Sequence, residues 1–252
     1  MSLWVKICAN TTLEDTRVAV EAGADAVGFV FAPSPRRVTP AEVAAIVPHL
    51  PETIEKIGVF VDASLEEIYT IVRECGLTGV QLHCDAEPEL PAKLRKHLGP
   101  GVRILRVVHF SEHAAKQAAL LAQDENIDAV LVDSRTATAV GGTGVPFDWE
   151  EARKSVFGKK ALASKAKLIA AGGLNLDNVA EAVKTLRPWG VDVASGVEEA
   201  PGQKNPAKVW AFVACARTAA QKTAAAAHKA KPAEKRQRAG AECGTPETTG
   251  EA

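Results

Sequence analysis

Residues 3–31 have the sequence LWVKICANTTLEDTRVAVEAGADAVGFVF, which contains the repeating unit of the fold. The stretch opens with the apolar run Leu3–Cys8 and closes with a second apolar run, Ala26–Phe31. Runs that are apolar on both faces are typical of parallel strands covered by helices. Between them, a helical segment begins at one of two consecutive threonines, carries acidic residues in its first turn and stops at Gly23. The unit is therefore a strand, a helix and a second strand.

The same two patterns continue along the chain to about residue 218. Eight strand–helix units of about 27 residues each predict an α/β fold, a single-domain (β/α)8 TIM barrel. An open doubly wound sheet is the alternative, but the first strand is followed by Ala9-Asn10-Thr11 and not by a G-x-G-x-x-G turn. Further strands are expected at Glu55–Val61, Gly79–Leu82, Arg103–Val108, Ala129–Val132, Lys167–Ala171 and Val191–Ala194, and further helices at about 40–48, 64–74, 88–97, 112–122, 148–157, 175–186 and 206–218.

The chain divides into a catalytic barrel, residues 1–218, and an Ala- and Lys-rich tail, residues 219–252. After Val213 there is no Val, Ile, Leu, Met, Phe, Tyr or Trp, so the tail cannot bury enough apolar surface to offset its chain entropy. Its alanines can prolong the preceding helix, but Pro232 and several glycines predict disorder beyond residue 227. The tail is interpreted as a solvated appendage, with a basic interaction segment as the alternative.

Charge and composition exclude several classes of protein. The 30 basic and 31 acidic residues give a net charge of −1, which argues against a nucleic-acid or membrane-surface protein. No apolar run reaches the roughly 20 residues that span a bilayer, and no signal peptide is visible at the start. The five cysteines, at positions 8, 75, 84, 215 and 243, are scattered as expected for free thiols in the cytoplasm.

Two glycine-containing turns predict a phosphate site. In a (β/α)8 barrel the chemistry lies at the carboxyl ends of the strands. Gly172-Gly173 follows the seventh strand and Ser195-Gly196 follows the eighth, so both turns expose backbone N–H groups in adjacent loops. The alternative is that these glycines only serve tight turns, but two such turns in the expected places favour phosphate binding.

Cys8 and Asp133 are candidate catalytic residues because each ends a strand at the barrel mouth. A thiol at that position can act as a base or nucleophile, although a free cysteine is more often a small buried hydrophobe. A carboxyl group kept in its acid form by an apolar mouth can donate a proton. A helix cap or an ion pair in a loop is the alternative for Asp133.

Several other polar side chains are expected at the barrel mouth. Arg36 or Arg37 could hold a substrate carboxylate through two hydrogen bonds, and the other would be a surface arginine. Lys6 lies within the first strand, where an unpaired charge would be costly, so we expect it to reach the mouth or to pair with an acid. Contacts to the substrate are also expected from Gln81, His83 and Asp192.

The ordered set of motifs resembles the phosphoribosylanthranilate isomerases of tryptophan biosynthesis. One such motif is weak evidence, but the set appears in the family's order and covers nearly all of residues 3–210. The matching stretches are Lys6-Ile7-Cys8, Gly23–Phe31, Ser34-Pro35-Arg36, Val80–His83, Asp133-Ser134, Gly141–Gly144 with Phe147-Asp148-Trp149, Ala171–Leu174 and Ser195–Glu198.

The resemblance implies an isomerase that rearranges N-(5-phosphoribosyl)anthranilate by Amadori chemistry, without metal or organic cofactor. It assigns the general base to Cys8, the general acid to Asp133 and the anthranilate carboxylate to Arg36, with the phosphate on the turns after the last two strands. It implies a phosphorylated small-molecule substrate and a monomer or homodimer. The family usually has glycine after the cysteine, where this chain has Ala9, so the loop either uses ordinary backbone angles or is shaped differently.

Three other functions compete with this one. A sugar isomerase of the histidine pathway usually has an aspartate at the end of the first strand, and indole-glycerol-phosphate synthase relies on lysines and glutamates. Cys8 with Asp133 fits neither of them. A non-catalytic barrel that binds a ligand or protein would more readily have lost Cys8, Asp133 or the phosphate turns, and all of them are present.

Overall fold

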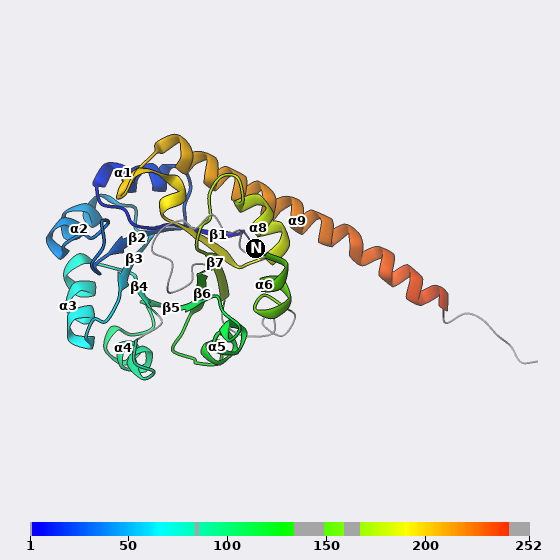
Figure 1. The fold of residues 1–252 in the computed structure, drawn as a ribbon, viewed down its shortest axis with the longest axis horizontal. Helices are drawn as coiled ribbons and strands as arrows, with labels where there is room; N and C mark the ends of the chain where they lie inside the picture. The colour runs from blue at the N-terminus through cyan, green and yellow to red at the C-terminus, as the bar shows by residue number, and fades with distance from the viewer. Residues whose placement is uncertain (1, 84–85, 134–148, 159–166, 242–252) are drawn as a thin grey trace, which may run out of the picture.

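Eight parallel strands form a closed barrel in chain order, with helices around its outside (Figure 1). This computed structural model describes residues 2–83, 86–133, 149–158 and 167–241, with the side chains of the last helix described up to residue 226. The ring closes because the first strand pairs with the eighth as well as with the second. The predicted (β/α)8 barrel is confirmed, and the open sheet is excluded because an open sheet has two unpaired edges.

Each barrel strand begins and ends within one residue of its predicted position. The agreement follows from the burial of nearly every strand residue, which produces the short apolar runs in the sequence. The strands are β1 (Trp4–Ile7), β2 (Ala26–Val30), β3 (Glu55–Phe60), β4 (Gly79–Leu82), β5 (Arg103–His109), β6 (Ala129–Asp133), β7 (Lys167–Ala171) and β8 (Gly190–Val193).

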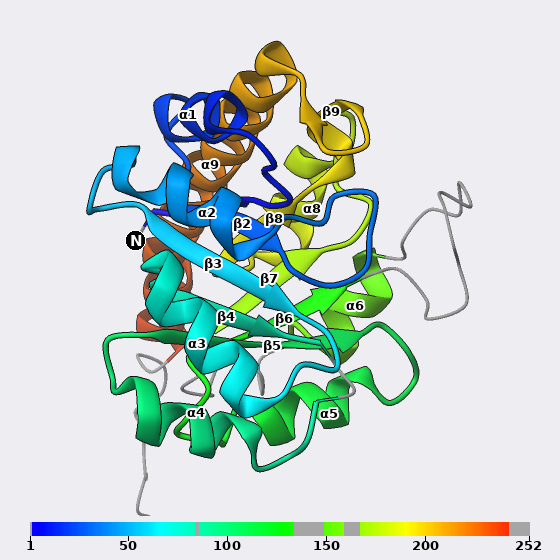
Figure 2. The same ribbon diagram turned by 90° about the vertical axis from the view of Figure 1, so that its left-hand side faces the viewer.

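The helices surround the strands, as the view turned by 90° also shows (Figure 2). Within the described part of the chain, no helix has the length and apolar composition needed to cross a membrane. The α-helices are α1 (Leu13–Glu21), α2 (Pro40–Ile46), α3 (Leu65–Cys75), α4 (Leu90–Leu98), α5 (Ala114–Leu121), α6 (Trp149–Ser155), α8 (Val179–Leu186) and α9 (Pro206–Ala241), and short 3-10 helices occupy η1 (Val47–His49) and η2 (Ser195–Val197).

Side-chain caps start the first three helices. The Thr12 side chain accepts a hydrogen bond from the Asp15 N–H and so fixes the start of α1. Ser64 likewise accepts from the Glu67 N–H at the start of α3, which is one of the two hydrogen bonds of a capping box. A complete capping box is present at Thr39 at the start of α2. The Thr39 side chain accepts a hydrogen bond from the Glu42 N–H, and the Thr39 N–H donates one to the Glu42 side chain.

Apolar side chains fill the barrel interior toward the amino-terminal ends of the strands and exclude water from it. Period-two alternation along each strand directs them inward. At the amino-terminal end, Trp4 stacks on Trp189 with ring centroids 5.1 Å apart, and Lys167 Nζ lies 4.4 Å from the Trp189 ring centroid. The interior cluster consists of Trp4, Ala26, Ile57, Leu105, Val107, Ala129, Leu131, Ile169 and Ala171.

A small antiparallel hairpin, β9 (Glu198–Ala200) with β10 (Gln203–Lys204), follows the barrel and was not predicted. Its turn contains Gly202, whose φ of +81° is a left-handed conformation that glycine adopts without strain. The hairpin contacts the start of α1, since the Lys204 N–H donates to Asp15 Oδ1 at 3.2 Å. It thereby brings two charged residues back over the carboxyl end of the barrel.

Helix α9 extends past residue 218, the predicted end of the barrel, to Ala241 and projects away from the body of the molecule (Figure 1). Its first turns are anchored by the buried side chains of Val209, Phe212, Val213 and Ala216. Alanine has the highest helix propensity, which explains the extension past residue 218. Disorder was predicted beyond residue 227, but the described backbone continues as a helix through Pro232 to Ala241, although proline within a helix costs about 3 kcal/mol.

Removing residues 221–252 should leave the thermal unfolding midpoint almost unchanged, because the described side chains from 221 to 226 contribute nothing buried to the core. The measurement is the midpoint by circular dichroism, compared with the full-length chain. A second truncation before Phe212, which is fully buried, is the control and should unfold the protein many degrees earlier. A large loss for the first truncation would show that the tail packs on the barrel.

Candidate active site

Strand β1 and the residue that follows it supply two polar residues two positions apart, Lys6 on the strand and Cys8 just past its end. Lys6 pairs in register with Asp192 on β8, and the Cys8 N–H donates to the Val193 carbonyl at 2.7 Å. The seam where the barrel closes therefore places the start of the chain beside its last barrel strand. This seam forms one side of the candidate active site.

The Lys6 ammonium is fully buried and is held by two acceptors. Its Nζ lies 2.9 Å from Gln81 Oε1 on β4 and 2.9 Å from Asp192 Oδ1 on β8. Burial lowers the pKa of Lys6, but the Asp192 carboxylate and the Cys8 side chain outweigh it, so the pKa is raised and the ammonium stays charged. The predicted pairing of Lys6 with an acid is confirmed.

Cys8 is 7% exposed, at the junction between the apolar interior and the barrel mouth. Burial raises the pKa of its thiol, while Lys6 and, more weakly, Lys204 oppose this increase and Asp192 adds to it. Gly28 on β2 forms the adjacent wall, where a β-carbon would lie only 2.7 Å from Cys8 Sγ. Glycine is therefore required opposite the sulfur.

The residue after the cysteine adopts a left-handed backbone conformation. Ala9 has a φ of +62°, so of the two alternatives for this loop, ordinary backbone angles are excluded. This conformation costs an L-residue other than glycine about 1–2 kcal/mol. Asn10 holds the loop in place, since its Nδ2 donates to the carbonyls of Ile7 at 2.8 Å and Gly28 at 3.2 Å.

Arg36, the candidate carboxylate ligand, is already oriented by an acid. Its Nε lies 2.9 Å and its Nη2 2.7 Å from the carboxylate of Glu198, the first residue of the hairpin. Lys204 Nζ holds the same carboxylate at 3.1 Å. Burial raises the pKa of Glu198, but hydrogen bonds from Arg36 and the charge of Lys204 outweigh it and lower the pKa overall. Within the described chain, Arg36 Nη1 makes no hydrogen bond, so that edge of the guanidinium can take a ligand.

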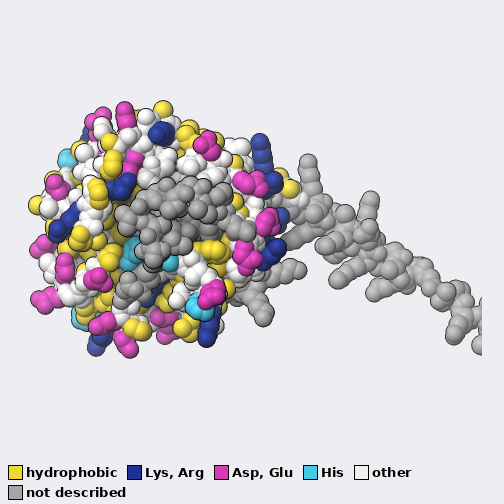
Figure 3. All heavy atoms as spheres, viewed as in Figure 1, with side chains coloured by type: hydrophobic (Ala, Val, Ile, Leu, Met, Phe, Trp, Pro, Cys, Tyr) yellow, Lys and Arg dark blue, Asp and Glu magenta, His cyan; other side chains and the backbone are white. Residues whose placement is uncertain are grey.

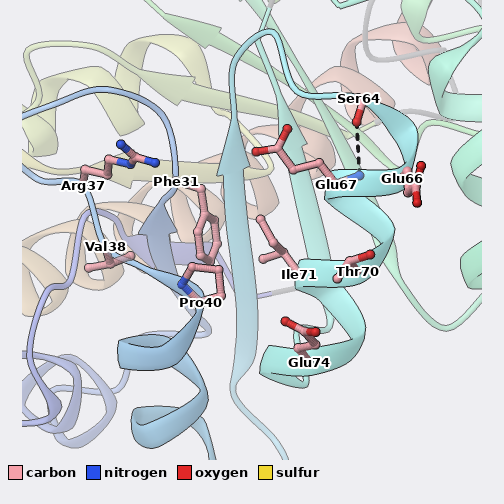
Figure 4. A pocket seen from close by; sticks show the side chains of 10 residues that line it. All are labelled: Phe31, Arg37, Val38, Pro40, Ser64, Glu66, Glu67, Thr70, Ile71 and Glu74. Carbon is pink, nitrogen blue, oxygen red and sulfur yellow. Dashed lines mark hydrogen bonds between the residues drawn. The ribbon is translucent and has the colours of Figure 1, made fainter.

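Arg37 faces a different part of the surface, an open groove between the β2–α2 connection and α3 (Figure 4). Glu66, Glu67 and Glu74 line the same groove. Three carboxylates would repel a carboxylate ligand, so the groove does not suit Arg37 as the alternative to Arg36. Arg37 is exposed, as predicted for one of the two arginines.

Asp133 ends β6 and is 4% exposed. In register beside it on β5 is His109, whose ring centroid lies 5.5 Å from that of His83. The sequence showed nothing that distinguished His109 from a surface histidine. The available signal was its spacing, because Leu105 and Val107 on the same strand face the interior and period two places His109 on that face.

The turns after β7 and β8 lie against each other. A β-carbon on Gly196 would come within 1.9 Å of the Leu174 carbonyl oxygen, so only glycine permits this approach. Gly172 and Gly173 have φ values of +82° and +63°. Asn178 Nδ2 donates to the Gly173 carbonyl at 2.9 Å and so ties the first turn to the start of α8. The predicted phosphate residues are thus brought together, and their binding role remains a prediction.

Some predicted features fall outside the described residues. These are Ser134, the Gly141–Gly144 run, Phe147-Asp148, Cys84 and Cys243. Among the described residues, no group of three or more His, Cys, Asp and Glu side chains is placed to hold a metal ion. The face seen in Figure 3 has Lys and Arg interspersed with Asp and Glu around its rim.

Comparison with known proteins identifies the family. The family model described as N-(5'-phosphoribosyl)anthranilate (PRA) isomerase matches residues 5–215. The chain belongs to this isomerase family. Among curated relatives, the N-(5'-phosphoribosyl)anthranilate isomerase of Geobacter sp. strain M21 is 42% identical over 211 residues, which cover 83% of this chain and 96% of the relative. The protein is thus an isomerase of tryptophan biosynthesis.

Solved structures of the family share the fold. Phosphoribosyl anthranilate isomerase from Thermotoga maritima is 33% identical with a TM-score of 0.73, covering 86% of this chain and 99% of that chain. A phosphoribosyl anthranilate isomerase in complex with reduced 1-(o-carboxyphenylamino)-1-deoxyribulose 5-phosphate is 32% identical with a TM-score of 0.71, over 86% and 99% of the two chains. A third solved structure is of monomers generated from the dimeric phosphoribosylanthranilate isomerase of Thermotoga maritima.

Proposed function

We propose that this protein converts N-(5-phospho-β-D-ribosyl)anthranilate to 1-(2-carboxyphenylamino)-1-deoxy-D-ribulose 5-phosphate, with Asp133 as general acid and Cys8 as general base. The observation that supports these roles is the position of Cys8. Its buried sulfur lies at the barrel seam, beside a cationic network and next to the β8 strand that leads into Ser195-Gly196. A pentose anchored by its phosphate at those turns would present its carbons to the sulfur.

The reaction requires two proton transfers at opposite sides of the sugar. The Asp133 carboxyl gives its proton to the ring oxygen, and the C1′–O bond breaks with its electron pair on that oxygen. The nitrogen lone pair then forms the C1′=N bond of a cationic iminium. The Cys8 thiolate takes the C2′ proton, which gives an enolamine that tautomerises to the aminoketone. The iminium charge favours the anionic form of the nearby sulfur at the step where it is needed.

The direct test is a turnover assay with the purified full-length chain. The substrate is unstable, so it is generated in place from anthranilate and phosphoribosyl pyrophosphate by a separately added phosphoribosyltransferase, which releases pyrophosphate. Its disappearance is followed together with the appearance of the aminoketone. We expect product only when active protein is present and none with the Cys8→Ala variant. Loss of substrate that depends on the protein, exceeds the loss in a protein-free control and yields no aminoketone would contradict the proposed reaction.

The phosphate is assigned to the paired turns formed by Gly172, Gly173, Ser195 and Gly196. Gly173→Val should raise KM strongly and abolish protection by inorganic phosphate, because a β-branched side chain both crowds the turn and opposes its positive φ. The matched control is Gly99→Val at the opposite end of the barrel, where φ is +76° and a β-carbon meets nothing within 4 Å. Both variants should lose stability, but only Gly173→Val should change KM. Normal KM in that variant would place the phosphate elsewhere.

The anthranilate carboxylate is assigned to the free edge of Arg36. Arg36→Met should raise KM far more than it lowers kcat, because a carboxylate is present in both the ground state and the transition state. Arg37→Met, which changes an exposed neighbour, is the control and should leave KM unchanged. If KM rises only in the Arg37 variant, the carboxylate site lies in the groove beside α3.

Gln81, His83 and Asp192 complete the proposed set of substrate contacts, and in the described chain Gln81 and Asp192 also hold Lys6. Each step of the proposal is a proton transfer that the named side chains perform, so we expect activity without an added metal or organic cofactor. We further expect a monomer or homodimer in the cytoplasm, with a phosphorylated small molecule as ligand and neither nucleic acid nor membrane as partner.

A further inference from the structure

The mechanism above gives no role to Lys6, although burying its charge is costly. The side chain of Lys6 has no exposed surface, and its Nζ is held from two opposite strands by Gln81 and Asp192, each at 2.9 Å. An ammonium group has three N–H donors, and these two contacts occupy two of them. A purely structural residue at this position could be apolar at lower cost, as it is in the rest of the interior cluster.

The third side of the ammonium faces the sulfur. Lys6 and Cys8 are two residues apart on one strand, so their side chains project into the barrel on the same face. A β-carbon on Gly28 would lie 3.0 Å from Lys6 Cε and 2.7 Å from Cys8 Sγ, so the lysine side chain and the sulfur border the same small gap. The two acceptors fix the ammonium beside Cys8, with which it interacts electrostatically.

We propose that Lys6 is a positioning residue of the reaction, whose ammonium, oriented by Gln81 and Asp192, stabilises the anionic, proton-accepting form of the Cys8 sulfur. The inference rests on the proposed function, since it supplies the thiolate that the C2′ proton transfer requires. Gln81 and Asp192, proposed above as substrate contacts, then also orient the Lys6 ammonium.

The charges around Cys8 agree with this role. Three charged groups act on the thiol: Lys6 from its own strand, Asp192 from β8 and Lys204 from β10. Burial and the Asp192 carboxylate raise the pKa of the Cys8 thiol overall, and Lys6 opposes that increase more strongly than Lys204 does. Removing the ammonium should therefore disfavour the thiolate, and removing the carboxylate should favour it.

The test is a pH titration of the thiolate ultraviolet absorbance in the full, ligand-free chain, taken as the difference from the same variant carrying Cys8→Ala. The subtraction removes the contributions of Tyr69 and of the other cysteines. At a fixed pH below the midpoint of the titration, Lys6→Met should lower the thiolate fraction by about tenfold or more. An opposite charge in a neighbouring side chain shifts a pKa by about one unit or more, and one unit is a tenfold change in that fraction. Asp192→Asn should raise it. Lys56→Met, which removes a different buried lysine, is the matched control and should leave the titration unchanged.

Lys6→Met and Asp192→Asn together distinguish an electrostatic role of Lys6 from a packing role. General disorder of the site would shift the Cys8 titration in the same direction in both variants, whereas the proposal expects opposite shifts. If Lys6→Met does not fold, the double variant Lys6→Met/Asp192→Asn buries no charge and differs from Asp192→Asn only in the ammonium. Its thiolate fraction should then fall below that of Asp192→Asn. An unchanged titration on removal of Lys6, in either background, overturns the inference. The absorbance is independent of turnover, so an active Cys8→Ala protein would overturn the proposed base and leave the Lys6 result intact.

Discussion

Replacing Asp133 by asparagine should lower kcat by at least about 100-fold, the usual contribution of a general acid. The substitution changes the side-chain volume very little and removes the proton that the ring oxygen must receive. Asp133 is buried at the end of β6 and its strand pairs on both sides, so we expect the fold to persist. The measurement is kcat with substrate generated in place, together with circular dichroism.

Asp62→Asn provides the matched control. Asp62 is exposed just past β3 at the same end of the barrel, and its φ of +53° is one that asparagine tolerates well. It loses the same charge and should keep normal turnover. If the Asp133 variant retains its rate and only its pH profile moves, the acid is another group.

Cys8→Ala should lower kcat by at least about 100-fold with little change in KM, because the sulfur acts on the C2′ proton and contributes little to binding. The loss for Asp133→Asn should match or exceed it, since no iminium forms until the ring has opened. The cavity left by one sulfur atom is small, and the Asn10 side chain still ties the loop to Ile7 and Gly28. We therefore expect the thermal unfolding midpoint to change by only a few degrees.

Cys75→Ala is the control for removal of a buried thiol. Cys75 is 2% exposed at the end of α3, and its thiol donates to the Pro40 carbonyl at 3.3 Å, on the outside of the barrel between α2 and α3. That variant should show a comparable change in stability and unchanged kcat. Near-normal turnover by Cys8→Ala would exclude the thiol as the base.

The barrel could be predicted from the sequence because its strands are buried on both faces and its helices carry local stop and start signals. The first strand, the threonine cap of α1 and the stop at Gly23 each depend on residues within a few positions of one another. The same locality explains the candidate site: Cys8 and Asp133 end apolar runs, and in a closed barrel the ends of strands meet.

The features that could not be predicted depend on distant contacts or on very short elements. The strands of the hairpin have three and two residues, too few to show alternation. The pairing of Arg36 with Glu198 joins residues 162 positions apart, so no local pattern indicates it. The backbone at Ala9 is imposed by Asn10 and by the strand pairing on either side, against the preference of alanine itself.

The ion pair at the barrel seam also bears on how the chain is made. Lys6 and Asp192 are 186 residues apart. At a synthesis rate of about 5–20 residues per second, Asp192 is therefore added to the chain roughly ten to forty seconds after Lys6. A compact intermediate built from the earlier strands would enclose an uncompensated charge, which costs several kcal/mol. The buried charge therefore destabilises partial barrels of the nascent chain, and the ring closes only when β8 has left the ribosome.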